Sequence, residues 1–522
     1  MTRLLNIFNR MFCAVPLAMA LIFSLIYTFG GWGFLSEKYV PEHFMLPVLP
    51  GIFRLAALAL VVVLTIYICN KRSGEQKKQI KNGIDVRCKD LLLVFAATLV
   101  IRLTIILLLK NSVEPYSDFA RTWNLALGET AGNLEYYTLF PTYLNFAVLE
   151  SSIVSMLGKE YCWMLVINAV FCGITSVGIV LIANNLGLPE REAVTAGFVY
   201  VFMPSNIAYT LAGTPDFITI AFDTYGILCL IKFIKYSEDD FSFRKMCMAM
   251  MSAILLGIGA SYKSFAVIIL IAFAIAYCAR AVTKPSGRLH REKVNEAVAA
   301  IMIIAVMLIG YKATTKLILS ITEKIYTVEL DTSYSTPHFL LVGLNTEGEG
   351  QIHLGNLSRK YAERYLSNGY DQKDAERYAY VLLKEDWKNN KAQVPKLFIK
   401  KMVWAWQDDA IPVMYLTREL TCLENVPEEE NNTIIILAGV AQLYYIALLG
   451  FSLIGTEEYI RRRDMNYGME FVLLTIFGYY CLLFLSEAQS RYKCLITPYL
   501  CILAAMGTGK ILHPVTEREK TK

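Results

Sequence analysis

Residues 162–183 read CWMLVINAVFCGITSVGIVLIA, a run of 22 residues without a charged side chain. A helix of this length crosses the ~30 Å hydrocarbon core of a bilayer, which takes about 20 apolar residues. Comparable runs recur along the chain, so this stretch decides the fold class. We predict an all-α polytopic membrane protein.

The overall composition agrees with this prediction. Of the 522 residues, 55% are hydrophobic and 18% are charged, and the net charge is +5. Soluble domains cannot hide so many uncharged runs, and so small a net charge does not indicate a nucleic-acid partner. Most of the 12 Cys lie in or beside apolar runs and none forms a CxxC pair, which argues against disulfide and metal frameworks.

Twelve segments have the length and apolarity of membrane spans. They are 12–30, 51–70, 91–109, 162–183, 192–210, 217–234, 246–261, 264–281, 297–316, 433–454, 468–486 and 494–509. The first follows Arg3 and Arg10, is long for a signal peptide and has no persuasive cleavage site after it. We therefore interpret it as a retained anchor helix.

Positive charge decides whether one further apolar run, 139–158, also spans. If it does not, the short loops on one side of the membrane hold 26 Lys and Arg and those on the other side hold 7. Lys and Arg concentrate in cytoplasmic loops. We therefore predict that 139–158 lies in or dips into the outer interface, that both termini are cytoplasmic and that the long loop 317–432 is extracytoplasmic.

These assignments divide the chain into four parts. Residues 1–90 form a two-span extension with a basic cytoplasmic loop, and 91–316 form a membrane core with a first outer loop at 110–161. Residues 317–432 are predicted to form an α-rich extracytoplasmic domain. Residues 433–522 supply the last spans and a cytoplasmic tail.

Two outer-face carboxylates are candidates for catalysis. Asp118 follows the third span, and a carboxylate there has the chemistry of a general base. A structural alternative is that Ser117 or Asp118 caps the helix that follows. Asp216 lies in an outer loop that opens the sixth span. Its structural alternative is a helix start in which Thr214 is the cap and Asp216 favours the helix dipole.

Two basic residues at the same face are candidates for binding a phosphate. Lys263 occupies the tight turn between the seventh and eighth spans, and Arg491 lies in the last outer loop, four residues after Glu487. Both could instead extend to the interface without a specific ligand. Arg102 and Asp223 lie within spans, where charge is costly, and we expect them to pair with each other.

The order of these features resembles the polytopic glycosyltransferases of the GT-C fold. The resemblance is to the bacterial branch of the protein mannosyltransferase and aminoarabinose-transferase type. It rests on the outer acidic residue, an aromatic stretch around Tyr137, TPHFLLVGLN at 336–345 and EAQSRY at 487–492. It covers about 91–345 and 395–510. Ser117-Asp118 stands where the family has an acidic pair.

The resemblance implies a GT-C-like bundle of about 12 transmembrane helices that moves a sugar from a polyprenyl-phosphate donor to a cell-envelope acceptor with inversion. The acceptor is a glycan, a lipid or a protein. No cofactor is certain, and a divalent cation is left open. The implied location is the plasma membrane, among membrane lipid, with the active site on the extracytoplasmic face.

The chemistry of the residues and the resemblance together give seven candidate site residues. The implied catalytic residues are Asp118 and Asp216. The implied substrate-binding residues are Arg491, Lys263, His338, Tyr137 and Glu487.

Two other functions share this hydropathy profile. A transporter or flippase of lipid-linked sugars is expected to show matched halves with broken helices at the bilayer midplane. The sequence shows no such halves, and its polar candidates gather at one face. A polymer ligase that uses diphosphate donors would share the outer Arg and the aromatic residues, so sequence separates it poorly from the first prediction.

Overall fold

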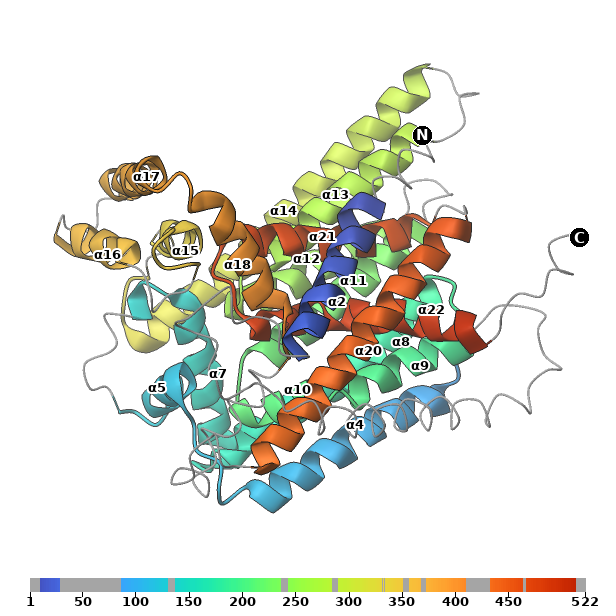
Figure 1. The fold of residues 1–522 in the computed structure, drawn as a ribbon, viewed down its shortest axis with the longest axis horizontal. Helices are drawn as coiled ribbons and strands as arrows, with labels where there is room; N and C mark the ends of the chain where they lie inside the picture. Colours follow the sequence, from blue (N-terminus) through green and yellow to red (C-terminus); the bar gives the residue numbers. More distant parts are fainter. Residues whose placement is uncertain are drawn as a thin grey trace, which may run out of the picture.

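The structure, a computed structural model, is a bundle of helices with a smaller group of helices at one side (Figure 1). It describes residues 10–28, 86–129, 137–235, 243–283, 290–330, 332, 334–350, 356–367, 372–409, 432–462 and 466–512. Within these ranges the chain forms helices and turns, and no β-strand occurs there. This confirms the predicted all-α polytopic class.

Seven helices in the described ranges are long and apolar enough to cross a membrane. They are α4 (Cys88–Leu109), α8 (Cys162–Asn185), α11 (Asp216–Lys235), α12 (Phe243–Tyr262), α14 (His290–Tyr326), α20 (Asn432–Arg462) and α21 (Tyr467–Leu485). Each coincides with a predicted span. The span predicted to end at 316 continues in α14 to Tyr326.

An eighth crossing is a bent pair of helices. α9 (Glu190–Val201) is followed after two residues by α10 (Pro204–Tyr209) and the 3₁₀ turn η4 (Thr210–Ala212), with a bend of 52°. Pro204 explains the break, because proline lacks an N–H and disfavours helical backbone in the residue before it. The predicted continuous span 192–210 is therefore broken.

The remaining predicted spans are shorter helices or fall outside the described residues. Three shorter helices stand at predicted spans: α2 (Val15–Thr28), which the π-helical turn η1 (Arg10–Ala14) precedes, α13 (Ala266–Thr283) and α22 (Thr497–Leu512). The predicted span 51–70 lies outside the described residues. The run 139–158 forms α7 (Pro141–Leu157), which is not among the helices long and apolar enough to cross.

Small residues let the last spans pack closely. A Cβ added to Gly455 of α20 would lie 1.9 Å from the carbonyl oxygen of Leu503 in α22. A Cβ added to Gly507 of α22 would lie 2.1 Å from the carbonyl oxygen of Phe451. The two backbones are therefore in contact, as is common where membrane helices cross at small residues.

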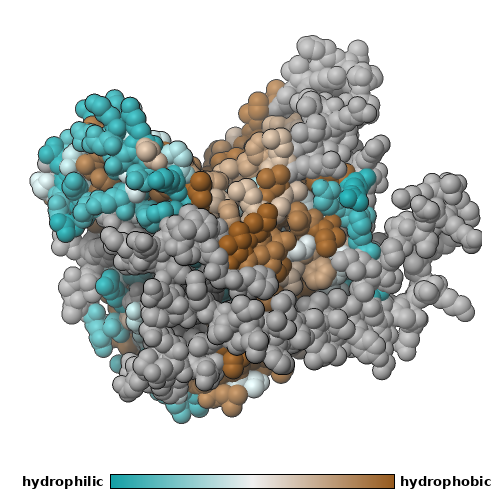
Figure 2. All heavy atoms as spheres, in the orientation of Figure 1, coloured by the Kyte–Doolittle hydropathy of each residue, from teal (hydrophilic) through white to brown (hydrophobic). Residues whose placement is uncertain are grey.

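The smaller group of helices lies beside the bundle, next to α7 (Figure 1). Its members are α5 (Ser117–Ala126), α15 (Ser335–Leu344), α16 (Leu357–Ser367), α17 (Gln372–Asn389) and α18 (Val394–Trp406). Figure 2 shows hydrophilic side chains over this group and an apolar surface over the middle of the bundle. Where the group meets α7, Phe140 just before α7 packs against Tyr334 just before α15, with ring centroids 5.5 Å apart.

The chain direction brings several helix ends together. α4, α12, α14 and α21 end, and α8, α11 and α13 begin, at the end of the bundle that carries the smaller group of helices. We call this the site end. All seven candidate residues lie in segments at this end.

Candidate functional site at one end of the bundle

The segment before α11 is shaped by a glycine. Gly213 has a φ of 54°, in the left-handed region, and a Cβ there would lie 2.1 Å from the Tyr161 hydroxyl oxygen. Only glycine meets both conditions without strain. The turn leads through Thr214 into α11, whose first residue is Asp216. The Thr214 hydroxyl accepts a bond from the Asp216 amide at 3.2 Å, so the predicted capping role of Thr214 is present.

The carboxylate of Asp216 is buried and fully engaged. Its side chain is 1% exposed. Tyr209 donates to Oδ2 at 2.5 Å, and Thr214 donates to the same oxygen at 2.9 Å. The other oxygen forms an ion pair with the ammonium of Lys263. Both carboxylate oxygens therefore have partners within the chain.

Lys263 and Arg491 meet at one aromatic ring. Lys263 lies in the turn between α12 and α13, and its ammonium is 4.9 Å from the ring centroid of Tyr492. The guanidinium of Arg491 is 5.3 Å from the same centroid. Cations are attracted to the faces of aromatic rings at such distances. The structure thus gathers the two predicted phosphate-binding residues around Tyr492.

The last loop of the site end holds Tyr492 in place. Tyr492 belongs to the 3₁₀ turn η6 (Ser490–Leu495), and its hydroxyl donates to Glu487 Oε2 at 2.8 Å. Gln489 donates to Glu487 Oε1 at 2.6 Å. Burial, reinforced by Glu487 and opposed by Arg491, raises the pKa of Tyr492 well above 10. The phenol therefore stays a donor, and Glu487 orients the ring that the two cations share.

Asp118 has a different environment. α5 begins at Ser117 with Tyr116 in the N-cap position, so neither Ser117 nor Asp118 is the N-cap residue that the sequence predicted. Instead, Tyr143 donates to Asp118 Oδ2 at 3.1 Å. Arg121 Nη1 lies 3.9 Å from Oδ1. The Asp118 side chain is 37% exposed, which leaves it accessible to a ligand.

Tyr137 and His338 lie in the aromatic packing near Asp118. Tyr137 is buried, and its ring centroid is 5.6 Å from that of Tyr143. His338 of α15 is 5.3 Å from the ring of Phe140, and its Nδ1 is 3.4 Å from the Tyr334 hydroxyl. Burial lowers the pKa of His338 to about 4, so it is neutral near pH 7. Its ring contacts join α15 to Phe140, at the start of α7, and do not reach Lys263 or Arg491.

Asn145 links the Asp118 side of the site to the Lys263 side. It lies on α7, two residues after Tyr143, and its amide donates to the Ser261 carbonyl at 2.8 Å. Its side-chain oxygen accepts a bond from Thr322 of α14 at 2.6 Å. Ser261 is two residues before Lys263. One buried amide therefore fixes α7 against the helix end that carries the cation.

A second contact connects the same two parts. Trp123 of α5 packs edge-on against Tyr161, with centroids 5.2 Å apart. Tyr161 in turn lies against Gly213 in the segment before Asp216. Tyr161 thus lies between the helix that carries Asp118 and the segment that leads into Asp216.

The expected pairing of Arg102 with Asp223 is wrong. Arg102 donates from Nε to Thr210 and from Nη1 to the carbonyl of Val201, each at 3.3 Å. The Oδ1 atom of Asp223 is buried without a hydrogen-bond partner in the described part of the chain. Thr210 and Val201 belong to the bent helix pair, which therefore supplies acceptors to two of the three guanidinium nitrogens.

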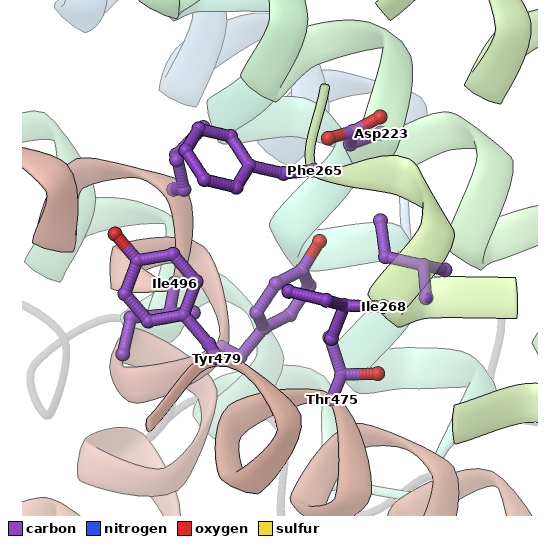
Figure 3. Close-up of a pocket in the computed structure, with 9 residues that line it drawn as sticks. Asp223, Phe265, Ile268, Thr475, Tyr479 and Ile496 are labelled. Atoms are coloured by element: carbon purple, nitrogen blue, oxygen red, sulfur yellow. The ribbon is translucent and has the colours of Figure 1, made fainter. Parts of the chain in front are cut away.

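Asp223 lines a small, mostly apolar cavity (Figure 3). The cavity has a volume of about 20 Å³, close to what one or two water molecules need. Phe265 and Tyr479 form part of its wall. The Phe265 centroid is 6.4 Å from that of Tyr492, so the cavity adjoins the ring that Lys263 and Arg491 share.

Tyr209 and Asn145 were not singled out from the sequence, and Tyr143 was noted only as part of the aromatic stretch around Tyr137. Their roles depend on contacts between distant segments, for which a single sequence carries no signal. In the described ranges, no group of three or more His, Cys, Asp or Glu side chains is placed to hold a metal ion.

Comparison with known proteins finds a family model that matches part of the chain. Residues 130–318 match the model of the dolichyl-phosphate-mannose-protein mannosyltransferases. This range contains Tyr137, Asp216 and Lys263 and begins after Asp118. No curated protein sequence matches the chain.

Two solved structures of one archaeal enzyme are similar to the chain. The oligosaccharyltransferase of Archaeoglobus fulgidus in its apo form has 13% identity and a TM-score of 0.44, over 83% of this chain and 51% of that one. Its complex with zinc and sulfate has 13% identity and a TM-score of 0.41, over 81% and 49%. The chain spans about half the length of that enzyme. Over residues 130–318, this polytopic membrane protein is therefore similar to the dolichyl-phosphate-mannose-protein mannosyltransferases, a family of glycosyltransferases.

Proposed function

We propose that the protein transfers a sugar from a polyprenyl-phosphate carrier to a cell-envelope acceptor, at the extracytoplasmic face of the plasma membrane and with inversion at the anomeric carbon. The observation that carries this proposal is the meeting of Lys263 and Arg491 at the Tyr492 ring, at an end of the membrane bundle. A polyprenyl carrier keeps its chain in the hydrocarbon, so its phosphate must lie at this depth.

The two cations suit a leaving phosphate. As the bond from the anomeric carbon to the phosphate oxygen breaks, the electron pair stays on that oxygen and negative charge grows there. Cations positioned in advance stabilise such charge without reorganisation. Arg491 offers two parallel donors to a phosphate. Lys263 is oriented by Asp216, whose carboxylate oxygens are both engaged within the chain.

Asp118 is the general base in this proposal. An acceptor hydroxyl attacks the anomeric carbon from the face opposite the phosphate, and its proton passes to Asp118. The carboxylate is accessible, is oriented by Tyr143 and lies on a different helix from the cations. Asp216 is not accessible in this way, so we assign to it the role of orienting Lys263. The products are the glycosylated acceptor and polyprenyl phosphate.

The test is to identify what the purified protein releases in detergent. The donor carries a radiolabelled sugar on a polyprenyl monophosphate, and the control is the D118N variant. The proposal predicts loss of labelled donor together with release of polyprenyl monophosphate. Turnover only with a diphosphate-linked donor would instead support the polymer ligase. In a second assay, with the protein reconstituted in lipid vesicles, movement of intact donor across the bilayer without release of the carrier would support a flippase.

A further inference from the structure

α18 places a lysine between the ends of two other helices. Lys401 is 1% exposed. Its ammonium donates to the carbonyl of Gly343 in α15 and to the carbonyl of Phe484 in α21, each at 2.6 Å. Carbonyls in the last turn of a helix lack intrahelical partners and carry the negative end of the helix dipole. One cation therefore satisfies two helix ends.

Two glycines make room for this lysine. A Cβ on Gly343 would lie 2.3 Å from the Leu485 carbonyl oxygen, so α15 and α21 touch backbone to backbone. Gly350 has a φ of 81°, and a Cβ there would lie 2.7 Å from Lys401 Cγ. The Gly350 carbonyl accepts a bond from the Ala488 amide at 3.1 Å. We call Gly343, Gly350, Lys401 and residues 484–488 the Lys401 junction.

The Lys401 junction includes Glu487, the residue that orients Tyr492. Burial lowers the pKa of Lys401 to about 7, and the negative charge of Glu487 opposes this shift. The neighbouring Lys400 instead pairs with Glu349, at the half-buried edge of the same loop. The junction thus holds the segment 484–488 on both sides of Glu487, and Glu487 in turn bonds Tyr492, the ring that Lys263 and Arg491 share.

We propose that Lys401 is a positioning residue for the leaving-phosphate site, and that the docking of α15–α18 onto residues 484–488 holds Tyr492 in the place where Lys263 and Arg491 meet. This inference rests on the proposed function. It makes the helices beside the bundle part of the donor site. Removing the lysine leaves two helix ends without their shared donor, and the 486–492 segment is then free to shift away from Lys263.

The experiment measures the donor KM, the acceptor KM and kcat for K401M, E487Q and the double variant. We expect K401M and E487Q each to raise the donor KM by roughly 10-fold, with a smaller change in the acceptor KM. The donor KM of the double variant should be no higher than that of the more impaired single variant, because both substitutions act through the same segment. K400M is the matched control, since it removes an ion pair of α18 outside the junction, and its donor KM should stay at the wild-type value.

Amide hydrogen exchange of residues 484–495 supplies a readout that needs no substrate. Exchange should be faster in K401M than in wild type and unchanged in K400M. If K401M does not accumulate, K401Q keeps a donor without the charge, and E487Q tests the same link from the other side. A wild-type donor KM in E487Q, additive effects in the double variant, or equal exchange in K401M and K400M would overturn the inference. A wild-type enzyme that releases no polyprenyl phosphate would overturn the proposed function instead.

Discussion

Asp118 and Asp216 are both carboxylates at the start of a helix, yet their surroundings give them different chemistry. Asp216 is buried, accepts hydrogen bonds from Tyr209 and Thr214 and forms an ion pair with Lys263. Asp118 is about one-third exposed, accepts a hydrogen bond from the Tyr143 phenol and lies 3.9 Å from the exposed Arg121 guanidinium. A carboxylate must be reachable and able to take up a proton to act as a base. Environment, rather than residue type, therefore divides the two roles.

This difference predicts opposite responses to the same substitution. D216N removes the charge that balances the partly buried Lys263, and breaking such a pair costs on the order of 3–5 kcal/mol of unfolding free energy. D118N removes a charge from an accessible position and should change stability by about 0.5 kcal/mol or less. Thermal unfolding of both variants in detergent measures the difference. Equal melting temperatures would contradict the account of Asp216.

His338 predicts how stability depends on pH. Its pKa is about 4 in the folded protein and about 6.5 in an unfolded chain, so the unfolded state binds more protons between these values. Stability should therefore fall as the pH drops from 6.5 towards 4, by at most about 3 kcal/mol from this residue.

The H338F variant tests that sign. Phenylalanine fits the aromatic contacts with Phe140 and Tyr334 but cannot be protonated. Between pH 8 and pH 7 both proteins should show the same slope of melting temperature with pH. Below pH 6.5 the wild type should lose stability faster than H338F. Parallel curves down to pH 4 would show that His338 is not buried as described.

At the scale of elements, glycines decide how closely segments approach. Gly213 and Gly128 both have positive φ, at 54° and 87°. A Cβ at Gly213 would meet Tyr161, whereas a Cβ at Gly128 would meet nothing within 4 Å. The two positions therefore separate backbone strain from steric contact.

We expect G213A to lose both stability and transfer activity, because the Asp216 segment must move away from Tyr161. Left-handed backbone alone costs a non-glycine residue roughly 1–2 kcal/mol. G128A should lose about that much stability and keep its turnover. Melting temperature and initial rate measured on both variants check this. A G213A enzyme that matches G128A in both measurements would mean that the segment is not tightly packed.

The helices could be predicted from the sequence more readily than the contacts between them. Apolar runs of about 20 residues predicted the seven long helices because each must satisfy its own backbone within the bilayer. The break before Pro204 was missed, because the surrounding run is continuously apolar. The pairing of Arg102 with Asp223 failed for a related reason: spacing along two helices does not tell which faces meet.

Part of the candidate site was also accessible from sequence. Asp216, Lys263 and Arg491 were chosen separately as polar residues at outer span ends, and the structure brings them together around Tyr492. Lys401 was not chosen, since a lysine in an amphipathic helix ordinarily faces solvent. Its burial depends on Gly343 and Gly350, which are distant from it in the chain.

For the whole molecule, the topology predicts which positions face the outside. Lys360 on α16 is exposed, and Cys88 at the start of α4 is exposed near the opposite end of the bundle. In intact spheroplasts, an impermeant maleimide should label K360C, made in a C422S background to remove the other loop cysteine. Cys88 should react only after permeabilisation. The reverse pattern would invert the membrane orientation and move the site to the cytoplasmic face.

The central claim is that the base and the leaving-phosphate site are separate parts of one active site. A donor titration of D118N and R491K, made side by side with wild type, tests this division most directly. D118N should lower kcat by roughly 100-fold or more at a donor KM close to wild type, because it removes only the base. R491K keeps the charge but loses the paired donors, so it should raise the donor KM by roughly 10-fold or more. Normal turnover by D118N, or an R491K enzyme with wild-type donor dependence, would contradict the claim.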